Sequence, residues 1–324
     1  MTDLTRRLLV SAALVAGTLL AAPAFAQDAT PVSALQAPDA REGEYVEVDG
    51  ARIFYEARGE GPAVMLLHGY PLSGALFARM RDELQTNHTV VTVDHRGYGK
   101  SEASENPGTV ERYATDAIAV MDKLGIDKAA IGGMSMGGPI VFEMFRQAPD
   151  RFSAMILIDT IAAAPSPMEK GIWEGAQTAI EDGGLEKVIP FLMPQMLTGE
   201  TRQTMPEQAE YLTTVMKGAT KEAALGGAKA LANRPDSTET LDEIEVPTLV
   251  LVGRADPVYA YEVSQRMKDA IGDNATLAII EGASHAAVFE KPAESAQAVA
   301  EFLAKAAGAD GTAQPAVVDD TPSD

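Results

Sequence analysis

AAIGGMSMGG, residues 129–138, is the stretch that decides the fold. Its first half is an apolar run typical of a buried strand, and a helical pattern follows over Met136–Gln147. Between them Ser135 stands in a G-x-S-x-G pattern at a tight strand-to-helix turn, where flanking glycines avoid backbone collisions. The serine hydroxyl then projects at a helix N-terminus, where partial positive charge favours a developing anion. The pattern predicts Ser135 as a nucleophile, and an incidental serine in a glycine-rich turn is the competing interpretation.

A serine nucleophile needs a base, and the sequence contains four histidines. His285, in EGASH directly after the last predicted strand, is the candidate. His68 ends a strand and is expected to shape an oxyanion loop, while His95 is expected to have a structural or pocket-wall role. His88 begins a strand, at the wrong end of the sheet.

The base needs an acid that orients it. Asp256, in GRADP, follows the predicted strand Thr248–Val252. Asp159, which closes the predicted strand Ala154–Ile158, is the alternative. The order Ser135, Asp256, His285 along the chain is a known order for catalytic triads, and we favour Asp256.

Two backbone N–H groups are expected to form the oxyanion hole. Met136 supplies one as the residue after the nucleophile, and the HGYP loop supplies the other. Pro71 has no N–H, so Tyr70 is the donor in that loop. The candidate pocket residues are His68, His95, Met134 and Trp173.

Strands and helices alternate along the chain, which predicts an α/β fold with a mostly parallel eight-stranded sheet and helices on both faces. The first two strands form a hairpin at Asp49-Gly50. The predicted strands are Glu44–Val48, Arg52–Ala57, Ala63–Leu67, Thr89–Val93, Ala129–Gly133, Ala154–Ile158, Thr248–Val252 and Thr276–Ile280. The core therefore comprises residues 44–159 and 243–306.

Residues 160–242 interrupt this alternation with helical periodicity broken by prolines. We interpret them as a helical cap inserted between two strands. The segment carries Trp173 and several methionines, whose soft side chains suit an adaptable apolar pocket, although each one singly is more typical of ordinary core.

The two ends of the chain differ from the core. Residues 1–26 combine Arg6 and Arg7, an apolar stretch and an A-x-A site ending at Ala26, which is the layout of a secretory signal peptide. We expect cleavage after Ala26, through either the Sec or the twin-arginine route, and a periplasmic or secreted protein with no stable membrane anchor. Residues 27–43 are predicted to be a flexible lead-in, and residues 307–324 an acidic disordered tail.

Composition excludes several functions. The chain of 324 residues has a formal charge of -21. Such a charge repels phosphate backbones, so no nucleic-acid partner is expected. The chain has no cysteine, which removes disulfides, thiol nucleophiles and cysteine-based zinc sites. No histidine pair has metal-ligand spacing, so we expect no metal. Chemistry at Ser135, His285 and Asp256 implies no cofactor. The oligomeric state is left open.

The segments LLHGYP, VDHRGYGKS, GGMSMGG, VPTLVLVGRADP and GASHAAVFEKP together resemble the α/β-hydrolase superfamily over about residues 44 to 306. Within it, VDHRGYGKS, AVMDKLGIDKAAIGGMSMGG and ANRPDST are most similar to the esterase and 3-oxoadipate enol-lactonase-like branch. The HGYP loop is also similar to that of perhydrolases and cofactor-free haloperoxidases.

The residues and the resemblance together predict a carboxylic ester hydrolase that cleaves a small-molecule ester or lactone through an acyl-enzyme. Ser135, His285 and Asp256 would act as nucleophile, base and orienting acid. The alternatives are perhydrolysis at the same residues, with peroxide replacing water, and a ligand receptor with little turnover.

Overall fold

Eight strands form one sheet in the computed structural model, which describes residues 30–103 and 108–309. The strand order is β1-β2-β4-β3-β5-β6-β7-β8. β2 pairs antiparallel with β1 and β4, and the remaining neighbours are parallel. The strands are β1 Glu44–Val48, β2 Ala51–Arg58, β3 Ala63–Leu67, β4 Thr89–Val93, β5 Ala129–Met134, β6 Phe152–Ile158, β7 Thr248–Gly253 and β8 Ala275–Ile280. The predicted α/β class with a mostly parallel eight-stranded sheet is confirmed.

The central strands are short apolar runs because helices bury them on both faces. Every residue of β5 and β7 is buried. The β1–β2 hairpin turns at Asp49 and Gly50, whose φ angles of 47° and 74° both lie in the left-handed region that a tight two-residue turn requires.

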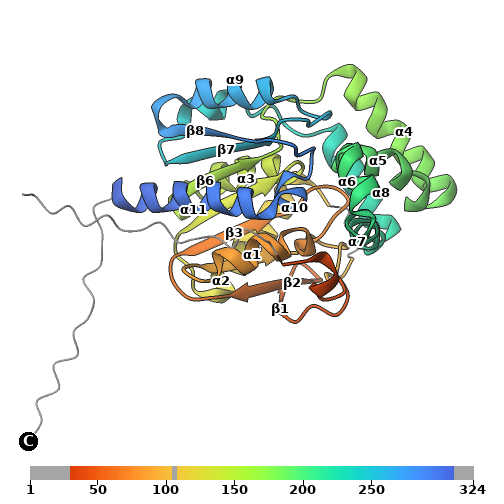
Figure 1. Ribbon diagram of the computed structural model, residues 1–324, viewed down its shortest axis with the longest axis horizontal. Coiled ribbons are helices and arrows are strands. Elements are labelled where there is room, and N and C mark those ends of the chain that lie inside the picture. The colour runs from red at the N-terminus through yellow and green to blue at the C-terminus, as the bar shows by residue number, and fades with distance from the viewer. Residues whose placement is uncertain (1–29, 104–107, 310–324) are drawn as a thin grey trace, which may run out of the picture.

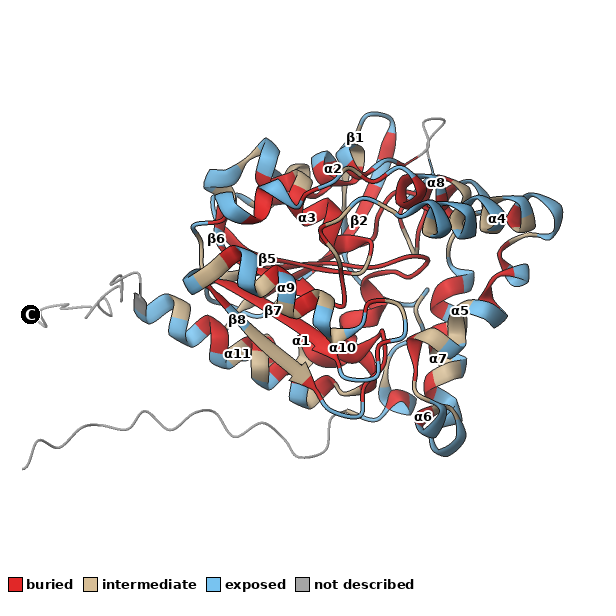
Figure 2. Cartoon of the chain, turned by 90° about the horizontal axis from the view of Figure 1, so that it is seen from above, coloured by how far each residue is buried: buried red, intermediate tan, exposed pale blue. Residues whose placement is uncertain are grey.

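Helices cover both faces of the sheet. α1 and α11 lie on one face, and α2 and α3 lie on the other (Figure 2). α9 packs against β7 and the edge strand β8. The core helices are α1 Ala78–Leu84, α2 Val110–Leu124, α3 Gly137–Gln147, α9 Tyr261–Ile271, α10 Ala287–Glu290 and α11 Pro292–Ala309. The 3-10 helices are η1 Val32–Ala34, η2 Gly74–Phe77, η3 Pro149–Arg151, η4 Leu185–Lys187, η5 Glu239–Glu243 and η6 Gly272–Asn274.

Five α-helices follow β6 and precede β7, and they gather at one end of the molecule (Figure 1). They are α4 Pro167–Gly183, α5 Ile189–Met196, α6 Gly199–Thr204, α7 Pro206–Lys217 and α8 Lys221–Ala232. Prolines stand in the first turn of α4, α5 and α7, where the missing N–H has no helical partner to lose. We call these five helices the cap.

The prediction of a flexible lead-in over residues 27–43 is wrong for its described part. Val32 is buried in η1, and Arg41 is only 2% exposed. The Arg41 guanidinium forms ion pairs with Glu56 at 2.9 Å and with Asp94 at 2.5 Å. Local composition does not reveal these partners, because they lie 15 and 53 residues further along the chain.

The C-terminal boundary also differs, since α11 continues to Ala309 and includes the first residues of the predicted tail at 307–309. The predicted signal peptide at 1–26 and the rest of the tail, 310–324, lie outside the described residues. Within 30–103 and 108–309, none of the helices is both long and apolar enough to cross a bilayer.

Candidate active site

Ser135 lies on the sharp turn between β5 and α3. Its φ is 52°, a left-handed conformation that a non-glycine residue adopts only when its surroundings hold it there. Two hydrogen bonds do so: the Ser135 N–H donates to the carbonyl of Ile158 at 3.0 Å, and the Thr160 hydroxyl donates to the Ser135 carbonyl at 2.7 Å. The strained turn presents the Ser135 side chain at the carboxyl ends of the parallel strands.

The glycines of G-x-S-x-G are required by close backbone contacts. A Cβ on Gly133 would lie 2.2 Å from the carbonyl oxygen of Gly137, and one on Gly137 would lie 2.3 Å from that of Leu67. Any larger residue would move the turn that carries the serine.

Three side chains from three separate loops form a hydrogen-bonded chain. His285 Nε2 is 2.9 Å from Ser135 Oγ, and His285 Nδ1 is 2.9 Å from Asp256 Oδ2. The second carboxylate oxygen of Asp256 accepts hydrogen bonds from the N–H groups of Val258 at 2.7 Å and Tyr259 at 3.1 Å. The carboxylate is thereby held in one orientation, with Nδ1–H donating to it and Nε2 free to accept the serine proton.

The alternative acid, Asp159, has other hydrogen-bond partners than the His285 ring. Its two oxygens accept hydrogen bonds from the N–H groups of Gly253 at 2.8 Å and Ala287 at 3.1 Å. Burial, reinforced by the nearby charge of Asp256, raises the pKa of Asp159 well above its usual value. Asp159 therefore joins the end of β7 to α10, and the structure brings Asp256 to the imidazole.

The two predicted oxyanion donors lie beside the serine. A Cβ on Gly69, which precedes Tyr70, would approach the Ser135 Cβ to 2.9 Å, so the loop closely adjoins the nucleophile. Among the described residues, neither Tyr70 N–H nor Met136 N–H donates a hydrogen bond to another group. Both donors remain available to an oxygen that becomes negatively charged near Ser135.

The side chains of His68 and His95 form hydrogen bonds with the backbone of the oxyanion loop. His68 Nδ1–H donates to the Gly69 carbonyl at 2.8 Å, and His68 Nε2 accepts from the His95 N–H at 3.0 Å. His95 Nε2–H donates back to the His68 carbonyl at 3.1 Å. Burial lowers the pKa of His68 to about 3, so this ring is neutral at ordinary pH.

The prediction that His68, His95 and Met134 line the pocket is wrong, because each is 0% exposed and presents no surface to a ligand. Met134 belongs to the hydrophobic core. The two histidine rings pack against each other and against the buried rings of Tyr98 and Tyr113. Trp173 differs, since it lines an open groove between α4 and α5.

Sequence reasoning missed the contacts that join the histidine loop to the cap. The N–H groups of His285 and Ala286 donate to the carbonyls of Gln195 at 3.2 Å and Met196 at 2.9 Å, in the last turn of α5. Nearby, the Glu290 carboxylate accepts from the Ser284 N–H at 2.6 Å. The available signal was an acidic residue five positions after His285 in the otherwise apolar AAVFE.

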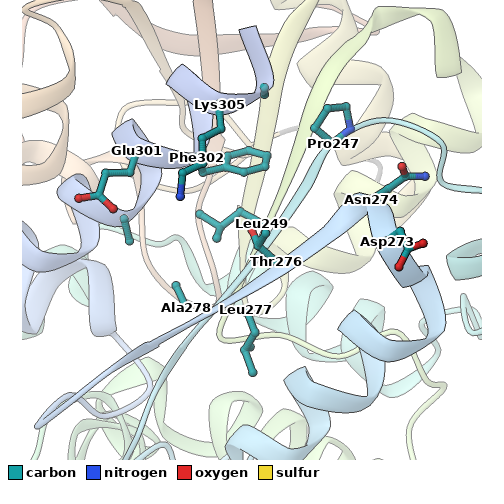
Figure 3. A pocket seen from close by; sticks show the side chains of 12 residues that line it. Pro247, Leu249, Asp273, Asn274, Thr276, Leu277, Ala278, Glu301, Phe302 and Lys305 are labelled. Atoms are coloured by element: carbon teal, nitrogen blue, oxygen red, sulfur yellow. The ribbon is translucent and has the colours of Figure 1, made fainter. Parts of the chain in front are cut away.

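A separate cavity of about 410 Å³ lies between β7, β8 and α11 (Figure 3). Pro247 and Asn274, which line it, precede β7 and β8 respectively, so the cavity lies at the amino ends of these strands. Ser135 lies at the carboxyl ends, where chemistry is expected in parallel sheets. Within the described residues, no cluster of histidine and acidic side chains is arranged to hold a metal ion.

Comparison with known proteins identifies the family of the chain. A model of the α/β hydrolase fold matches residues 62–292. The chain belongs to this family. The superfamily indicated by the motifs is therefore confirmed, and the relatives support a hydrolase.

Two curated relatives illustrate the range of the family. 3-Oxoadipate enol-lactonase 2 of Acinetobacter baylyi is 26% identical over 235 residues, covering 72% of this chain and 86% of that protein. A bifunctional esterase/perhydrolase of Acinetobacter calcoaceticus is 28% identical over 258 residues, covering 73% and 90%.

Two solved structures have a similar fold. A thermophilic esterase from Thermogutta terrifontis is 30% identical with a TM-score of 0.77, covering 82% of this chain and 97% of that one. The enol-lactonase from Burkholderia xenovorans is 25% identical with a TM-score of 0.75, covering 80% and 99%.

Proposed function

We propose that the protein is a serine hydrolase that cleaves a small-molecule carboxylic ester or lactone through an acyl-enzyme. The observation that carries the proposal is the continuous hydrogen-bonded chain from Ser135 Oγ through His285 to Asp256. The two unused N–H donors beside the serine, and the relatives named as esterases and enol-lactonases, support the same chemistry.

The geometry accounts for each step. Ser135 Oγ attacks the carbonyl carbon while His285 Nε2 takes the hydroxyl proton, and Asp256 stabilises the resulting imidazolium. The N–H groups of Tyr70 and Met136 bind the oxyanion. His285 then protonates the departing alkoxide, accepts a proton from water as that water attacks the acyl-enzyme, and returns it to Ser135 as the acid leaves. In a lactone the alcohol stays tethered to the acyl group throughout, and the water step releases a single hydroxy acid.

The deciding experiment measures hydrolysis of p-nitrophenyl acetate by the mature protein and by Ser135→Ala. We expect kcat to fall by about 10⁴-fold or more, since removing a triad member leaves only oxyanion binding and positioning. Ser153→Ala, on an exposed position of β6, is the matched control and should keep full activity. Turnover by Ser135→Ala at the wild-type rate would contradict the proposal, and tight ligand binding without any product burst would favour a receptor.

A second candidate is perhydrolysis, in which peroxide replaces water at the acyl-enzyme. It is favoured by relatives named as an esterase/perhydrolase and as a non-heme haloperoxidase of Rhodococcus erythropolis. Peracid formation from acetate and hydrogen peroxide, compared with ester hydrolysis by the same preparation, distinguishes the two acceptors.

We further propose that the protein is exported and processed after Ala26, on the pattern of its first residues. Expression of the full chain in a bacterial host, followed by fractionation and mass measurement, tests this. A periplasmic or secreted product that begins at Gln27 is expected. An intact chain that stays in the cytoplasm would contradict export.

A further inference from the structure

The described chain begins with a segment, residues 30–43, that precedes β1 and contacts both the cap and the core. We call it the strap. Its helix η1 lies against α7 of the cap (Figure 1), and the Tyr211 hydroxyl of α7 donates to the carbonyl of Gln36 at 3.4 Å. Towards the core, the Arg41 carbonyl accepts from the Lys100 ammonium group at 2.6 Å. The first residues of a domain keep a fixed position only when contacts of this kind hold them.

The strap reaches the catalytic end of the sheet through Asp94, which directly follows β4 and is 0% exposed. Asp94 Oδ2 accepts from the Arg41 guanidinium at 2.5 Å. Asp94 Oδ1 accepts from the Gly74 N–H at 2.7 Å. Gly74 is the last residue of the oxyanion loop, residues 68–74, which carries Tyr70. Arg41 is therefore one side chain away from the loop that supplies an oxyanion donor.

The other end of the oxyanion loop is held by the residue after Asp94. The His95 N–H donates to His68 Nε2 at 3.0 Å, and His95 Nε2–H donates to the His68 carbonyl at 3.1 Å. Asp94 and His95 share one rigid peptide unit, so a displacement of Asp94 would move both attachments of the loop.

Arg41 supplies the positive charge that keeps Asp94 in place. A buried carboxylate that loses its cation attracts water or a proton, and its hydrogen bonds to N–H groups then weaken. The Arg41 guanidinium is itself only 2% exposed, and it also pairs with Glu56 at 2.9 Å. Its planar fork therefore holds two carboxylates in one fixed arrangement.

We propose that Arg41 is a positioning residue of the enzyme, through which the strap fixes Asp94 and the oxyanion loop so that the Tyr70 N–H meets the oxyanion. This proposal rests on the proposed ester chemistry and adds a residue to it. Arg41 precedes residues 62–292, the part of the chain that matches the family model. The positioning is therefore supplied by a segment outside the part that defines the family.

The size of the expected effect follows from the role of the loop. Removal of one oxyanion donor typically lowers kcat by about 10²- to 10³-fold, and a misplacement by about 1 Å can cost about 10²-fold. A loop that keeps its donor but loses its anchor should therefore lower kcat by about 10- to 100-fold. KM should change little, because the oxyanion forms only after the substrate has bound.

Arg81 provides a matched control. It is buried like Arg41 and pairs with the other carboxylate oxygen of Glu56, at 2.7 Å, but its second ion pair is with Asp82 rather than Asp94. We compare Arg41→Met with Arg81→Met on p-nitrophenyl acetate, at a temperature where circular dichroism shows both to be folded. We expect Arg41→Met to lower kcat at least tenfold with KM within twofold, and Arg81→Met to keep kcat within twofold. Equal losses of kcat in the two variants would overturn the proposal.

A transition-state analogue tests the oxyanion hole without turnover. Phenylboronic acid forms a bond from boron to Ser135 Oγ while the hydroxyl proton passes to His285, and one oxygen of the tetrahedral boronate then occupies the hole. Calorimetry should show at least tenfold weaker binding to Arg41→Met and binding within twofold of the wild type for Arg81→Met. Unchanged boronate affinity in Arg41→Met would overturn this inference alone. A wild type that neither hydrolyses the ester nor binds the boronate would overturn the proposed function as well.

A second background shows whether Arg41 acts through Asp94. Asp94→Asn keeps an acceptor for the Gly74 N–H but carries no charge that needs a cation. Adding Arg41→Met to Asp94→Asn should lower kcat by less than threefold further. A further tenfold loss would show that Arg41 acts by another route and would overturn the proposal.

A milder pair of variants keeps the test decisive if Arg41→Met does not fold. Arg41→Lys retains a cation but loses the fork that joins both carboxylates, and Arg81→Lys makes the same change in the control. Arg41→Lys should lower kcat at least threefold with KM unchanged, while Arg81→Lys stays within the error of the wild type. Identical kinetics for the two lysine variants would overturn the proposal.

Discussion

Glu290 and Thr198 form a double hydrogen bond that joins the core to the cap. The carboxylate oxygen Oε1 of Glu290 accepts from the Thr198 N–H at 2.8 Å and from the Thr198 hydroxyl at 2.6 Å. The other oxygen accepts from the Ser284 N–H, next to His285. The Glu290 side chain is buried, so one carboxylate couples the position of the cap to that of the catalytic histidine.

Glu290→Gln is expected to lower kcat about 10- to 100-fold while KM for a short ester changes little. An amide offers only one acceptor oxygen for three donors, and a hydrogen bond to a charged group contributes ~1.5–3 kcal/mol. Steady-state kinetics on p-nitrophenyl acetate provide the measurement. Glu294→Gln, at an exposed position in the first turn of α11, is the control. A rise in KM with unchanged kcat would show that Glu290 does not position the histidine.

The two aspartates should respond differently to replacement by asparagine. Asp256→Asn disturbs the imidazole tautomer and should reduce kcat by about 10⁴-fold with a native fold. Asp159→Asn leaves one buried N–H, of Gly253 or Ala287, without a proper acceptor. It should therefore cost ~1–3 kcal/mol of unfolding free energy, with a much smaller loss of kcat. Denaturant unfolding and ester kinetics on both variants separate the roles, and a reversed pattern would reassign the acid.

The burial of neutral His68 should make the fold less stable in mild acid. Its pKa is about 3 in the folded protein because burial disfavours the charged ring, against about 6.5 when unfolded. The unfolded chain therefore binds more protons below pH 6.5, and stability falls as the pH decreases from 6.5 towards 3. Between pH 7.5 and pH 5 this single group should account for about 2 kcal/mol.

The measurement is urea unfolding of wild type and His68→Asn at both pH values. The variant should be less stable at pH 7.5 and should lose about 2 kcal/mol less than wild type on acidification. Between pH 7.5 and pH 8.5 the free energy of unfolding should change by the same amount in the two proteins. Identical acid slopes would show that the ring is already protonated or exposed.

Arg41→Met should destabilise the fold by about 3–5 kcal/mol, because it leaves the buried Asp94 without its ion-pair partner. Glu56 keeps its second ion pair, with Arg81 at 2.7 Å. Arg52→Met removes an exposed ion pair with Glu102 and should cost less than about 1 kcal/mol. Thermal or denaturant unfolding compares the two. Equal small effects would mean that the N-terminal segment is not anchored to the core.

Much of the fold is visible in the sequence because its signals are local. The apolar run at Ala63–Leu67 and the Asp49-Gly50 turn match β3 and the first hairpin as predicted. The short α10 was not predicted, since four residues carry too little periodicity to separate a helix from a loop. The anchored segment around Arg41 was also missed, because a lone arginine among alanine, proline and aspartate gives no sign of distant partners.

By itself, the sequence determined the α/β class, the strand-turn-helix context of Ser135 and the order of nucleophile, acid and histidine along the chain. These follow from short-range patterns, in which neighbouring residues dictate backbone geometry. Only the tertiary structure decided between Asp256 and Asp159, buried His68 and His95 beneath the oxyanion loop, and joined the cap to the histidine through Glu290. The reason is physical: hydrogen-bond partners and burial depend on which distant segments meet, and local sequence does not encode those distances.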